Sequence, residues 1–443
     1  MPATLSASRI NITGHLDVLC GQIGERYAGS SGDHDASDYI ERQFKRMGLT
    51  NVRSEPFEFP NWQYTQCTVR RAKGRRFQRV PSARPGVYST STPRGGVAGP
   101  LAYLEDGSKW NFDQPLRGRI GLIVGSLLLS QDEVKQRLAR SGLKAMLAVD
   151  ARLPVAWATS NGASPAWVDD YRLPTVGIPF MDAVSLVEAM PTRVKVEVTA
   201  QSFPATSYNV VAEVAGRNTD EVIVVSAHHD SVSGNVGADD NASGVVAILE
   251  LARLFAKRKP RRTLRFISYG VEERLSIGSY LYMRSLSAAE RKRLVCCINF
   301  DTVGSPVGSD QAQIVGDTAL ARLVEKIWDH RRHPLKITTG LNPYSDQFPM
   351  NILGIPSVFL TRRSVADTGY WNLHSVHDNL DHVSSITLKR TVESSAKVLD
   401  SAANSVKLPF RRRLSPGVRR DVRKMARSEY KHPWSPDDFD YNR

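Results

Sequence analysis

The stretch 221–255, EVIVVSAHHDSVSGNVGADDNASGVVAILELARLF, joins a strand pattern to a helix pattern through a polar connection. Residues 221–227 are mostly apolar and read as a strand, and His228 follows them directly. Asp240 lies just before a stripe of apolar residues at helical spacing, namely Ala242, Val245, Val246, Leu249 and Phe255. This order predicts a buried strand, a loop rich in polar side chains, and then a helix packed on the sheet.

Strands and helices continue to alternate along the rest of the chain. Strand-like runs cover 263–269, 295–300 and 356–360, and helical patterns cover 319–328 and 386–406. This alternation predicts an α/β fold with helices on both faces of a sheet. In such sheets, ligands gather at the carboxyl ends of the strands, and His228, Glu273 and Asp301 each stand at or just past such an end.

Five residues of this region are candidate metal ligands: His228, Asp240, Glu273, Asp301 and His374. Two imidazoles and three carboxylates can hold two divalent cations if one carboxylate bridges them. Two metal ions a few ångströms apart can activate a water molecule and polarise a carbonyl group. The pattern therefore predicts a two-metal hydrolase.

Two further residues have predicted roles beside these ligands. Of the adjacent pair Glu272 and Glu273, we assign Glu273 to the metal and Glu272 to proton transfer with a water molecule. Residues 228 and 230 of a strand point the same way, so Asp230 can accept the second ring N–H of His228 and orient the imidazole. His229 faces the other way, and we expect it to be structural.

Each of these residues also has an ordinary structural interpretation. Asp239 and Asp240 could cap the helix that follows, and we assign Asp239 to solvent or to support of the loop. Paired glutamates on a loop are usually solvated. Near His374, a surface position is the ordinary interpretation for several of the polar residues His377, Asp378, Asp381 and His382. The joint occurrence of all five candidates favours the metal centre.

Composition limits the class of protein. The chain has 443 residues with 41% hydrophobic content, enough for a large core and more than one structural unit. No apolar stretch reaches membrane-spanning length, and we expect no membrane partner. The N-terminus lacks the apolar core of a signal peptide, so the expected location is cytoplasmic, or secreted if the true start lies upstream.

The cysteines and the basic residues add little chemistry. Cys20, Cys67, Cys296 and Cys297 lack zinc-finger spacing, and we expect buried free thiols without a disulfide framework. Of the net charge of +14, the segment 407–443 contributes 11 Lys/Arg against 5 Asp/Glu. No nucleic-acid-binding motif accompanies it, so we favour a solvated, partly disordered tail over a nucleic-acid partner.

Several motifs resemble those of the zinc exopeptidase family that contains the bacterial two-zinc aminopeptidases, glutamate carboxypeptidase II and the glutaminyl cyclases. The segment GADDNASG at 237–244 is close to the family signature, and VEERLSIGS at 271–279 is similar to its Glu-Glu region. Arg26–Ser30 and Ser345-Asp346 resemble two shorter family segments. The resemblance implies a three-layer, phosphorylase/hydrolase-like fold with a mixed central sheet.

The resemblance also implies roles for the candidate residues. Asp240 would bridge two Zn²⁺ ions. His228 and Asp301 would complete one zinc site, and Glu273 and His374 the other. Glu272 would be the general base and acid, and Asp230 would orient His228.

The domain organisation follows from the same resemblance. Residues 1–94 would form the N-terminal part of the peptidase domain and 204–406 its catalytic part. Residues 95–203, with short apolar runs at 120–124, 145–149 and 173–179, resemble an inserted protease-associated domain that acts as a lid. Residues 407–443 are the basic tail.

Three positions depart from the family pattern. Gln347 replaces the histidine of the Ser-Asp-His segment, and Arg274-Leu275 replaces an early glycine. Leu373 occupies the position of a tyrosine whose hydroxyl can stabilise the tetrahedral intermediate. Three residues are candidates for that lost donor, namely Tyr344, Arg362 and Tyr370.

The sequence therefore predicts a dizinc exopeptidase, with aminopeptidase activity favoured by analogy. A carboxypeptidase or dipeptidase is the first alternative, with Arg362 and Arg363 as candidates to bind a substrate carboxylate. A non-catalytic binding protein on a peptidase fold is the second, although such relatives typically lose metal ligands. Side-chain preference and oligomeric state stay open.

Overall fold

The computed structural model describes residues 5–125, 131–149, 155–159, 165–328, 333–363 and 372–430. It divides into two compact units. Unit 1 consists of the chain up to Phe59 together with Thr206–Arg427, and unit 2 consists of Pro60–Ala205 with the segment from Ser428. Unit 2 begins at Pro60, whereas the insertion predicted from the sequence spans residues 95–203.

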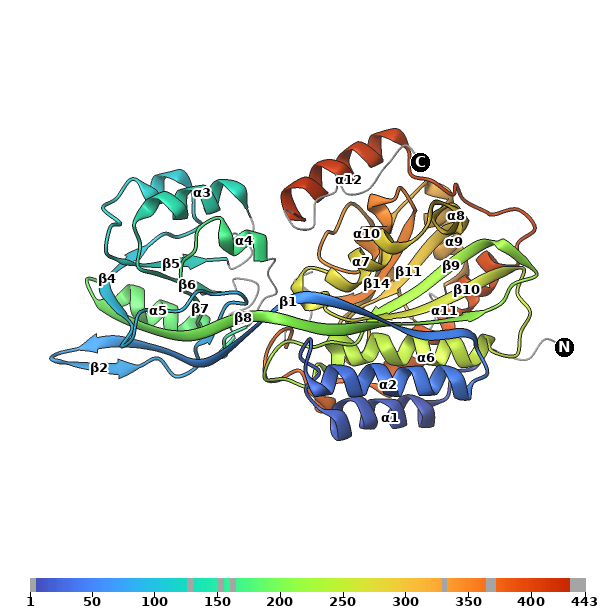
Figure 1. Ribbon diagram of the computed structural model, residues 1–443, viewed down its shortest axis with the longest axis horizontal. Coiled ribbons are helices and arrows are strands. Elements are labelled where there is room, and N and C mark those ends of the chain that lie inside the picture. The colour runs from blue at the N-terminus through green and yellow to red at the C-terminus, as the bar shows by residue number, and fades with distance from the viewer. Residues whose placement is uncertain are drawn as a thin grey trace. The chain divides into compact units, whose positions relative to one another are not determined.

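Unit 1 is built on a mixed sheet, as predicted (Figure 1). Strands β9 (Asn218–His228), β10 (Arg262–Tyr269), β11 (Leu294–Phe300) and β14 (Ser357–Arg363) run parallel to their neighbours in the order β14-β11-β9-β10. On one side, β12 (Ser309–Val315) pairs antiparallel with β14 and parallel with β13 (Leu335–Thr339). On the other side, β8 (Arg193–Val214) pairs antiparallel with β10.

Helices cover both faces of this sheet, which confirms the predicted layers (Figure 1). One layer contains α1 (Arg9–Leu16), η1 (Asp17–Ile23), α2 (Ser31–Arg46), α6 (Gly244–Phe255), α9 (Thr318–Ile327) and α11 (Ser385–Asn404). The other contains α7 (Ile277–Ser285), α8 (Ala288–Arg293) and α10 (Gln347–Ile352).

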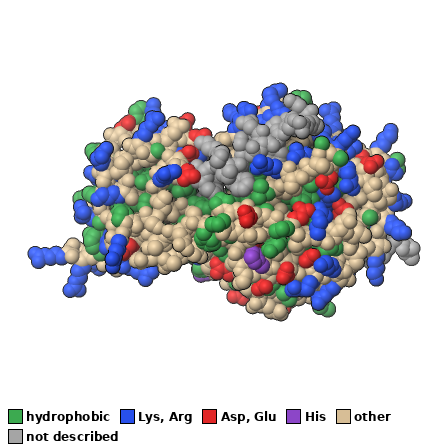
Figure 2. All heavy atoms as spheres, viewed as in Figure 1, with side chains coloured by type: hydrophobic (Ala, Val, Ile, Leu, Met, Phe, Trp, Pro, Cys, Tyr) green, Lys and Arg blue, Asp and Glu red, His purple; other side chains and the backbone are tan. Residues whose placement is uncertain are grey.

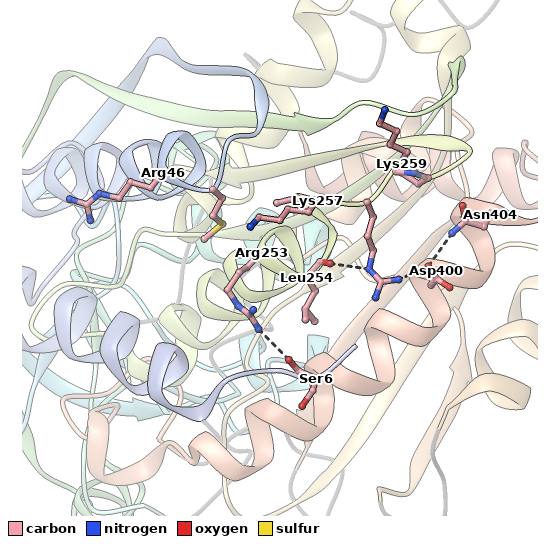
Figure 3. Close-up of a pocket in the computed structure, with 12 residues that line it drawn as sticks. Ser6, Arg46, Arg253, Leu254, Lys257, Lys259, Asp400 and Asn404 are labelled. Carbon is pink, nitrogen blue, oxygen red and sulfur yellow. Dashed lines mark hydrogen bonds and ion pairs between the residues drawn. The ribbon is translucent and has the colours of Figure 1, made fainter. Parts of the chain in front are cut away.

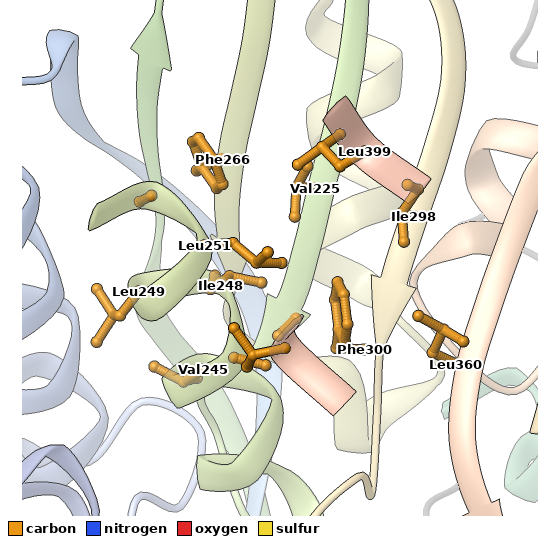
Figure 4. Close-up of a cluster of buried hydrophobic side chains, with 14 of the residues drawn as sticks. Val225, Val245, Ile248, Leu249, Leu251, Phe266, Ile298, Phe300, Leu360 and Leu399 are labelled. Atoms are coloured by element: carbon orange, nitrogen blue, oxygen red, sulfur yellow. The ribbon is translucent and has the colours of Figure 1, made fainter. Parts of the chain in front are cut away.

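The core of unit 1 lies between the sheet and the first helix layer. Val245, Ile248 and Leu251 of α6 point at the strands, where Val225 and Ile298 meet them (Figure 4). All five side chains are buried. Burial of each such side chain stabilises the fold by about 1.5–3 kcal/mol, so this apolar stripe fixes α6 and the loop before it against the sheet.

Unit 2 has its own sheet and cores. Its strands β4 (Val97–Tyr103), β5 (Ile120–Val124), β6 (Ala145–Val149) and β7 (Thr175–Gly177) are parallel, and β3 (Arg84–Pro85) adds an antiparallel edge. Helices η2 (Lys109–Phe112), α3 (Asp132–Ser141), α4 (Pro165–Asp169) and α5 (Phe180–Glu188) accompany them. A long strand β1 (Thr50–Lys73) pairs with β2 (Arg76–Arg79) as a hairpin.

The described part of the basic tail, up to residue 430, is folded and partly buried rather than solvated, and residues 431–443 lie outside the described residues. Residues 416–429 form α12 (Pro416–Glu429), with Val422 buried beneath it. Phe410 and Leu414 are also buried, and the Arg411 backbone N–H donates to Asp317. The many Lys and Arg residues of this segment made its few apolar residues easy to overlook. Phe410, Leu414 and Val422 hold the segment on unit 1.

Two sequence predictions concern features that carry no chemistry. All four cysteines are free, and Cys20, Cys296 and Cys297 are buried while Cys67 is partly exposed. Among the described residues, no helix combines the length and the apolar character needed to cross a bilayer.

Lys and Arg side chains are spread over the visible face of the molecule (Figure 2).

A cavity of about 870 Å³ lies where the C-terminal ends of α2, α6 and α11 meet (Figure 3). Its charged lining residues are Arg46, Arg253, Lys257, Arg258, Lys259 and Asp400. Arg253 is paired with Glu250, and Arg46, Lys257 and Lys259 are exposed. Because Asp240 precedes the other end of α6, this cavity is separate from the candidate metal centre by roughly the length of that helix.

Candidate metal centre

The five predicted ligands meet at the carboxyl edge of the parallel strands. His228 is the last residue of β9, and Asp301 follows β11 directly. Glu273 lies in η5 (Glu272–Arg274), just past β10, and Asp240 lies in η4 (Ala238–Ser243), before α6. Since β9, β10 and β11 are adjacent and parallel, their ends converge there, and His374 reaches the same place from the segment after the gap at 364–371.

Asp240 occupies the centre of this cluster. One carboxylate oxygen, Oδ1, lies 3.2 Å from His228 Nε2, and the other, Oδ2, lies 3.2 Å from His374 Nε2. His228 Nε2 is also 3.7 Å from Asp301 Oδ1, and His374 Nε2 is 3.2 Å from Glu273 Oε2. In each set of three, the ligand atoms all lie within 4.8 Å of one another, and the two sets share Asp240.

The donor atoms fit two zinc ions. Nitrogen and carboxylate oxygen are ordinary zinc ligands, and each set offers three, which leaves a position for water or substrate. His228 Nε2 and Glu273 Oε1 are buried without a hydrogen-bond partner in this structure. Buried polar atoms usually have a partner, and a zinc ion bound in each set would complete these two.

The charges of the cluster are strongly coupled. Burial disfavours an ionised Asp240, but the contacts with His228 and His374 outweigh it and lower the pKa of this carboxyl. Burial likewise opposes charge on the imidazoles, yet Glu273 and Asp240 raise the pKa of His374 to about 10. Burial, followed by the charge of Asp240, raises the pKa of Glu273 to about 6. Without metal, the imidazoles therefore hold the protons.

Glu272 faces the same space without belonging to either ligand set. Its Oε2 lies 3.8 Å from His228 Nε2, and its Oε1 accepts a hydrogen bond from Ser276 Oγ at 3.3 Å. Burial raises the pKa of Glu272 well above its ordinary value, although a charged His228 opposes this, and the nearby carboxylates add to the rise. Such a carboxyl can hold a proton near neutral pH, which suits a general base and acid.

Asp230 has a broader role than the one predicted. Its carboxylate accepts the backbone N–H groups of Glu272 at 2.9 Å and Glu273 at 3.2 Å. His228 Nδ1 lies 3.2 Å from the Asp230 carbonyl oxygen and 3.5 Å from its carboxylate. The carbonyl is thus the nearer partner of the imidazole, and the carboxylate mainly fixes the two glutamates.

Other buried residues hold the ligands in place, and sequence reasoning missed them. The Asp378 carboxylate accepts the backbone N–H groups of Asp239 and Asp240 at 2.8 and 3.0 Å. Asp378 is fully buried, which corrects its expected surface position. Ser345 donates to Asp301 Oδ2 at 2.7 Å. The one sequence clue to the role of Asp378 was its position, four residues after the candidate ligand His374.

The neighbours of the ligands also have definite positions. Asp239 is buried rather than solvated, and its Oδ1 accepts the Gly304 N–H at 2.5 Å, so it supports the loop. Burial raises the pKa of Asp239 to about 7. His229 points away from the cluster, where its Nε2 lies 3.1 Å from Asp33 Oδ1.

Arg26 connects the N-terminal motif to the loops that hold the ligands. This fully buried guanidinium donates to the carbonyl of His229 at 2.7 Å and to those of Val236 and Gly237 at 2.5 and 2.9 Å. His229 follows one ligand, and Gly237 lies three residues before Asp240. One side chain therefore joins both ends of the connection between β9 and α6.

Arg362 is unavailable to substrate, contrary to its predicted roles as a donor or carboxylate ligand. It is buried, and it donates to Asp310 Oδ1 at 2.6 Å and to the Gly308 carbonyl at 2.7 Å. Tyr344 is 41% exposed, and Tyr370 lies outside the described residues. Gln347, at the position of the missing histidine, donates to the Asn342 carbonyl.

Comparison with known proteins agrees with this geometry. Residues 209–399 match the family described as Peptidase family M28. An aminopeptidase of Pseudomonas aeruginosa is 32% identical over 342 residues, which cover 69% of this chain and 59% of that protein.

Solved structures show the same fold. An aminopeptidase from Aneurinibacillus sp. strain AM-1 is 26% identical with a TM-score of 0.69, covering 91% of this chain and 96% of that one. A zinc aminopeptidase from Bacillus subtilis is 22% identical with a TM-score of 0.74, covering 92% and 98%. The matched residues 209–399 contain all five candidate ligands, and over this region the chain matches peptidase family M28.

Proposed function

We propose that this protein is a co-catalytic dizinc aminopeptidase that removes N-terminal residues from peptides. The proposal rests on one observation: one carboxylate oxygen of Asp240 faces His228 and the other faces His374. In this proposal, His228 and Asp301 complete one zinc site and Glu273 and His374 the other. Two bound zinc ions would polarise the scissile carbonyl and lower the pKa of a water molecule to about 7.

Glu272 moves the proton in this proposal. Its carboxylate takes a proton from the attacking water and returns it to the amine of the leaving peptide. Burial favours its protonated form, while the positive charge of zinc ions bound beside it would favour the ionised form. These opposed effects bring the acid and base forms closer in energy, as a group that acts in both directions requires. Asp230 holds Glu272 in place through its backbone N–H.

Two observations support cleavage at the N-terminal end. The relatives described above are named aminopeptidases. Of the two cations proposed from the sequence to bind a substrate carboxylate, Arg362 and Arg363, Arg362 is buried against Asp310 and Arg363 is half-buried.

The test uses Glu272→Gln on zinc-loaded protein, with Glu188→Gln at an exposed position of α5 as the matched control. We expect kcat for aminoacyl-anilides to fall about 10²–10⁴-fold in Glu272→Gln with both zinc ions retained, and to stay unchanged in the control. Acetylation of the substrate N-terminus should abolish cleavage, while C-terminal amidation should not. Full turnover by Glu272→Gln, or cleavage only of N-blocked peptides, contradicts the proposal.

We also propose that unit 2 corresponds to the protease-associated-like insertion. Parallel strands β4 to β7 and separate apolar clusters support an independent fold inside the peptidase sequence. If it acts as a lid, its removal will change KM for long peptides more than for a single aminoacyl-anilide. Equal effects on both substrates would argue against that role.

A further inference from the structure

Strands β1 and β2 of unit 2 form an exposed hairpin whose end is unusually basic. The register pairs Arg70 with Arg79, Ala72 with Phe77 and Lys73 with Arg76, around a turn at Gly74-Arg75. Residues 73–79 are all exposed, including Phe77 at 43%. This end of the hairpin lies at the left of Figure 1, and Lys and Arg side chains project there in Figure 2.

The segment around the hairpin contains no acidic residue. Between Glu58 and Glu105 there is no Asp or Glu, whereas the same stretch contains eight basic residues, namely Arg70, Arg71, Lys73, Arg75, Arg76, Arg79, Arg84 and Arg94. This imbalance is local and separate from the basic tail. It gives one short element a strong positive potential.

The cations near the base of the hairpin have partners, and those at its end do not. Arg70 forms an ion pair with Glu197 at 2.9 Å, and Arg71 donates to the Ser185 carbonyl at 3.4 Å. Within the described part of the chain, no ion pair or side-chain hydrogen bond involves the four remaining cations, Lys73, Arg75, Arg76 and Arg79.

The register itself opposes hairpin stability. Lys73 lies directly opposite Arg76, and like charges at directly paired positions destabilise a hairpin. The fold gains nothing from this arrangement, because no described side chain neutralises it. An external polyanion would remove the repulsion and would bind all four cations at once.

We propose that the end of the β1–β2 hairpin binds the surface of anionic phospholipid bilayers. Cations lie on both faces of the ribbon and at its tip, so a headgroup layer around the tip can contact all of them. Phe77 supplies an exposed apolar ring that can enter the boundary between headgroups and acyl chains. This is peripheral binding to a surface, and it departs from the sequence-based expectation of no membrane partner.

A nucleic-acid partner fits the same hairpin less well. Proteins that bind single strands stack successive bases on several aromatic side chains, and the exposed residues 73–79 contain only Phe77. The cations could contact the phosphates or guanines of a duplex, but such binding would leave the exposed ring of Phe77 without a role. Charge complementarity combined with one interfacial ring therefore favours lipid.

The experiment measures co-sedimentation of the full chain with vesicles of phosphatidylglycerol and phosphatidylcholine, and with vesicles of phosphatidylcholine alone. We expect binding only to the anionic vesicles, with weakening as salt screens the charges. Removal of each cation should lower the partition coefficient roughly fivefold, so the triple variant Lys73→Gln/Arg75→Gln/Arg76→Gln should lose about a hundredfold. Phe77→Ser should also reduce partitioning.

The matched control removes the same charge elsewhere. Arg46→Gln/Lys257→Gln/Lys259→Gln alters three exposed cations of the cavity at the end of α6, and it should bind vesicles nearly as the unaltered protein does. Anilide hydrolysis in solution should be unchanged in both triple variants, which verifies folding. Equal losses in the two triples, or hairpin-dependent binding to a 20-nucleotide single strand or duplex without vesicle binding, overturns the proposal.

Discussion

Two arginines show how differently the metal centre and the hairpin use charge. Arg26 is fully buried, and its guanidinium donates to backbone carbonyls on both sides of the ligand loop. Arg75 is exposed at the turn of the β1–β2 hairpin, among other cations. Burial forces the first to satisfy its donors inside the protein, whereas water satisfies the second.

The difference separates charges that build the fold from charges that remain available to a partner. At the metal centre, a buried group left without its partner weakens the site. At the hairpin, removing a charge leaves the protein intact and changes only what it can bind. Substitutions in the two regions should therefore affect different measurements.

Asp240→Ala should have the largest effect, because Asp240 belongs to both ligand sets. We expect loss of both zinc ions and a fall in kcat/KM of about 10³-fold or more, since metal stabilisation of the transition state amounts to several kcal/mol. Metal content by atomic absorption and anilide kinetics measure this. Asp220→Ala, at an exposed position in β9, is the control and should keep two zinc ions. Retention of two equivalents by Asp240→Ala would refute the shared ligand.

The affinity for zinc should depend steeply on pH. Neighbouring carboxylates raise the pKa of His374 to about 10 and that of His228 well above its ordinary value, so both imidazoles are protonated in the metal-free protein at pH 7. Zinc must displace these protons, so its affinity rises with pH, about tenfold per unit for each proton released. Between pH 6 and pH 8 we expect at least a hundredfold increase.

Calorimetry in buffers of different ionisation enthalpy measures the protons released when zinc binds. A release of fewer than one proton at pH 7 would mean that the imidazoles are already neutral. Competition with a chelator of known affinity gives the dependence on pH independently.

Arg26→Met should act through the ligand loop. We expect zinc affinity to fall about 10–100-fold, as when other groups that orient metal ligands are removed. With zinc at saturation, kcat should recover, because Arg26 donates to backbone carbonyls beside the ligands and to none of the ligand side chains. Arg26→Lys should recover part of the affinity, since it keeps the charge with fewer donors. A variant that binds zinc normally but loses kcat would assign Arg26 a different role.

The sequence predicted the ligands better than the residues that hold them. His228, Asp301 and Glu273 follow apolar strands, and strand ends are where an α/β sheet collects its ligands. Asp378 does not follow an apolar strand, so this pattern could not identify it. Its burial depends on contacts with the backbone of Asp239 and Asp240, far away along the chain.

The same limit applies to the tail and the hairpin. Arginine-rich residues 411–420 favoured a solvated tail, yet Val422 and Phe410 are buried on a surface that only the folded unit provides. The alternating residues 52–59 are typical of a strand and mark the beginning of β1, but they do not indicate its extension to Lys73, because pairing with β2 and β8 sustains that part. The propensity of the residues indicates where a strand forms, and its partners in the sheet decide how long it becomes.

Arg75→Gln should have the smallest effect on the protein itself. Because the side chain is exposed and makes no described contact, we expect the free energy of unfolding to change by no more than about 0.5 kcal/mol. Lys73→Gln should even raise stability by a few tenths of a kcal/mol, since it removes a like-charge pair with Arg76. Urea denaturation of both variants measures this. A loss above about 1 kcal/mol for either variant would show that the hairpin cations support the fold, and the contrast with Arg26 would fail.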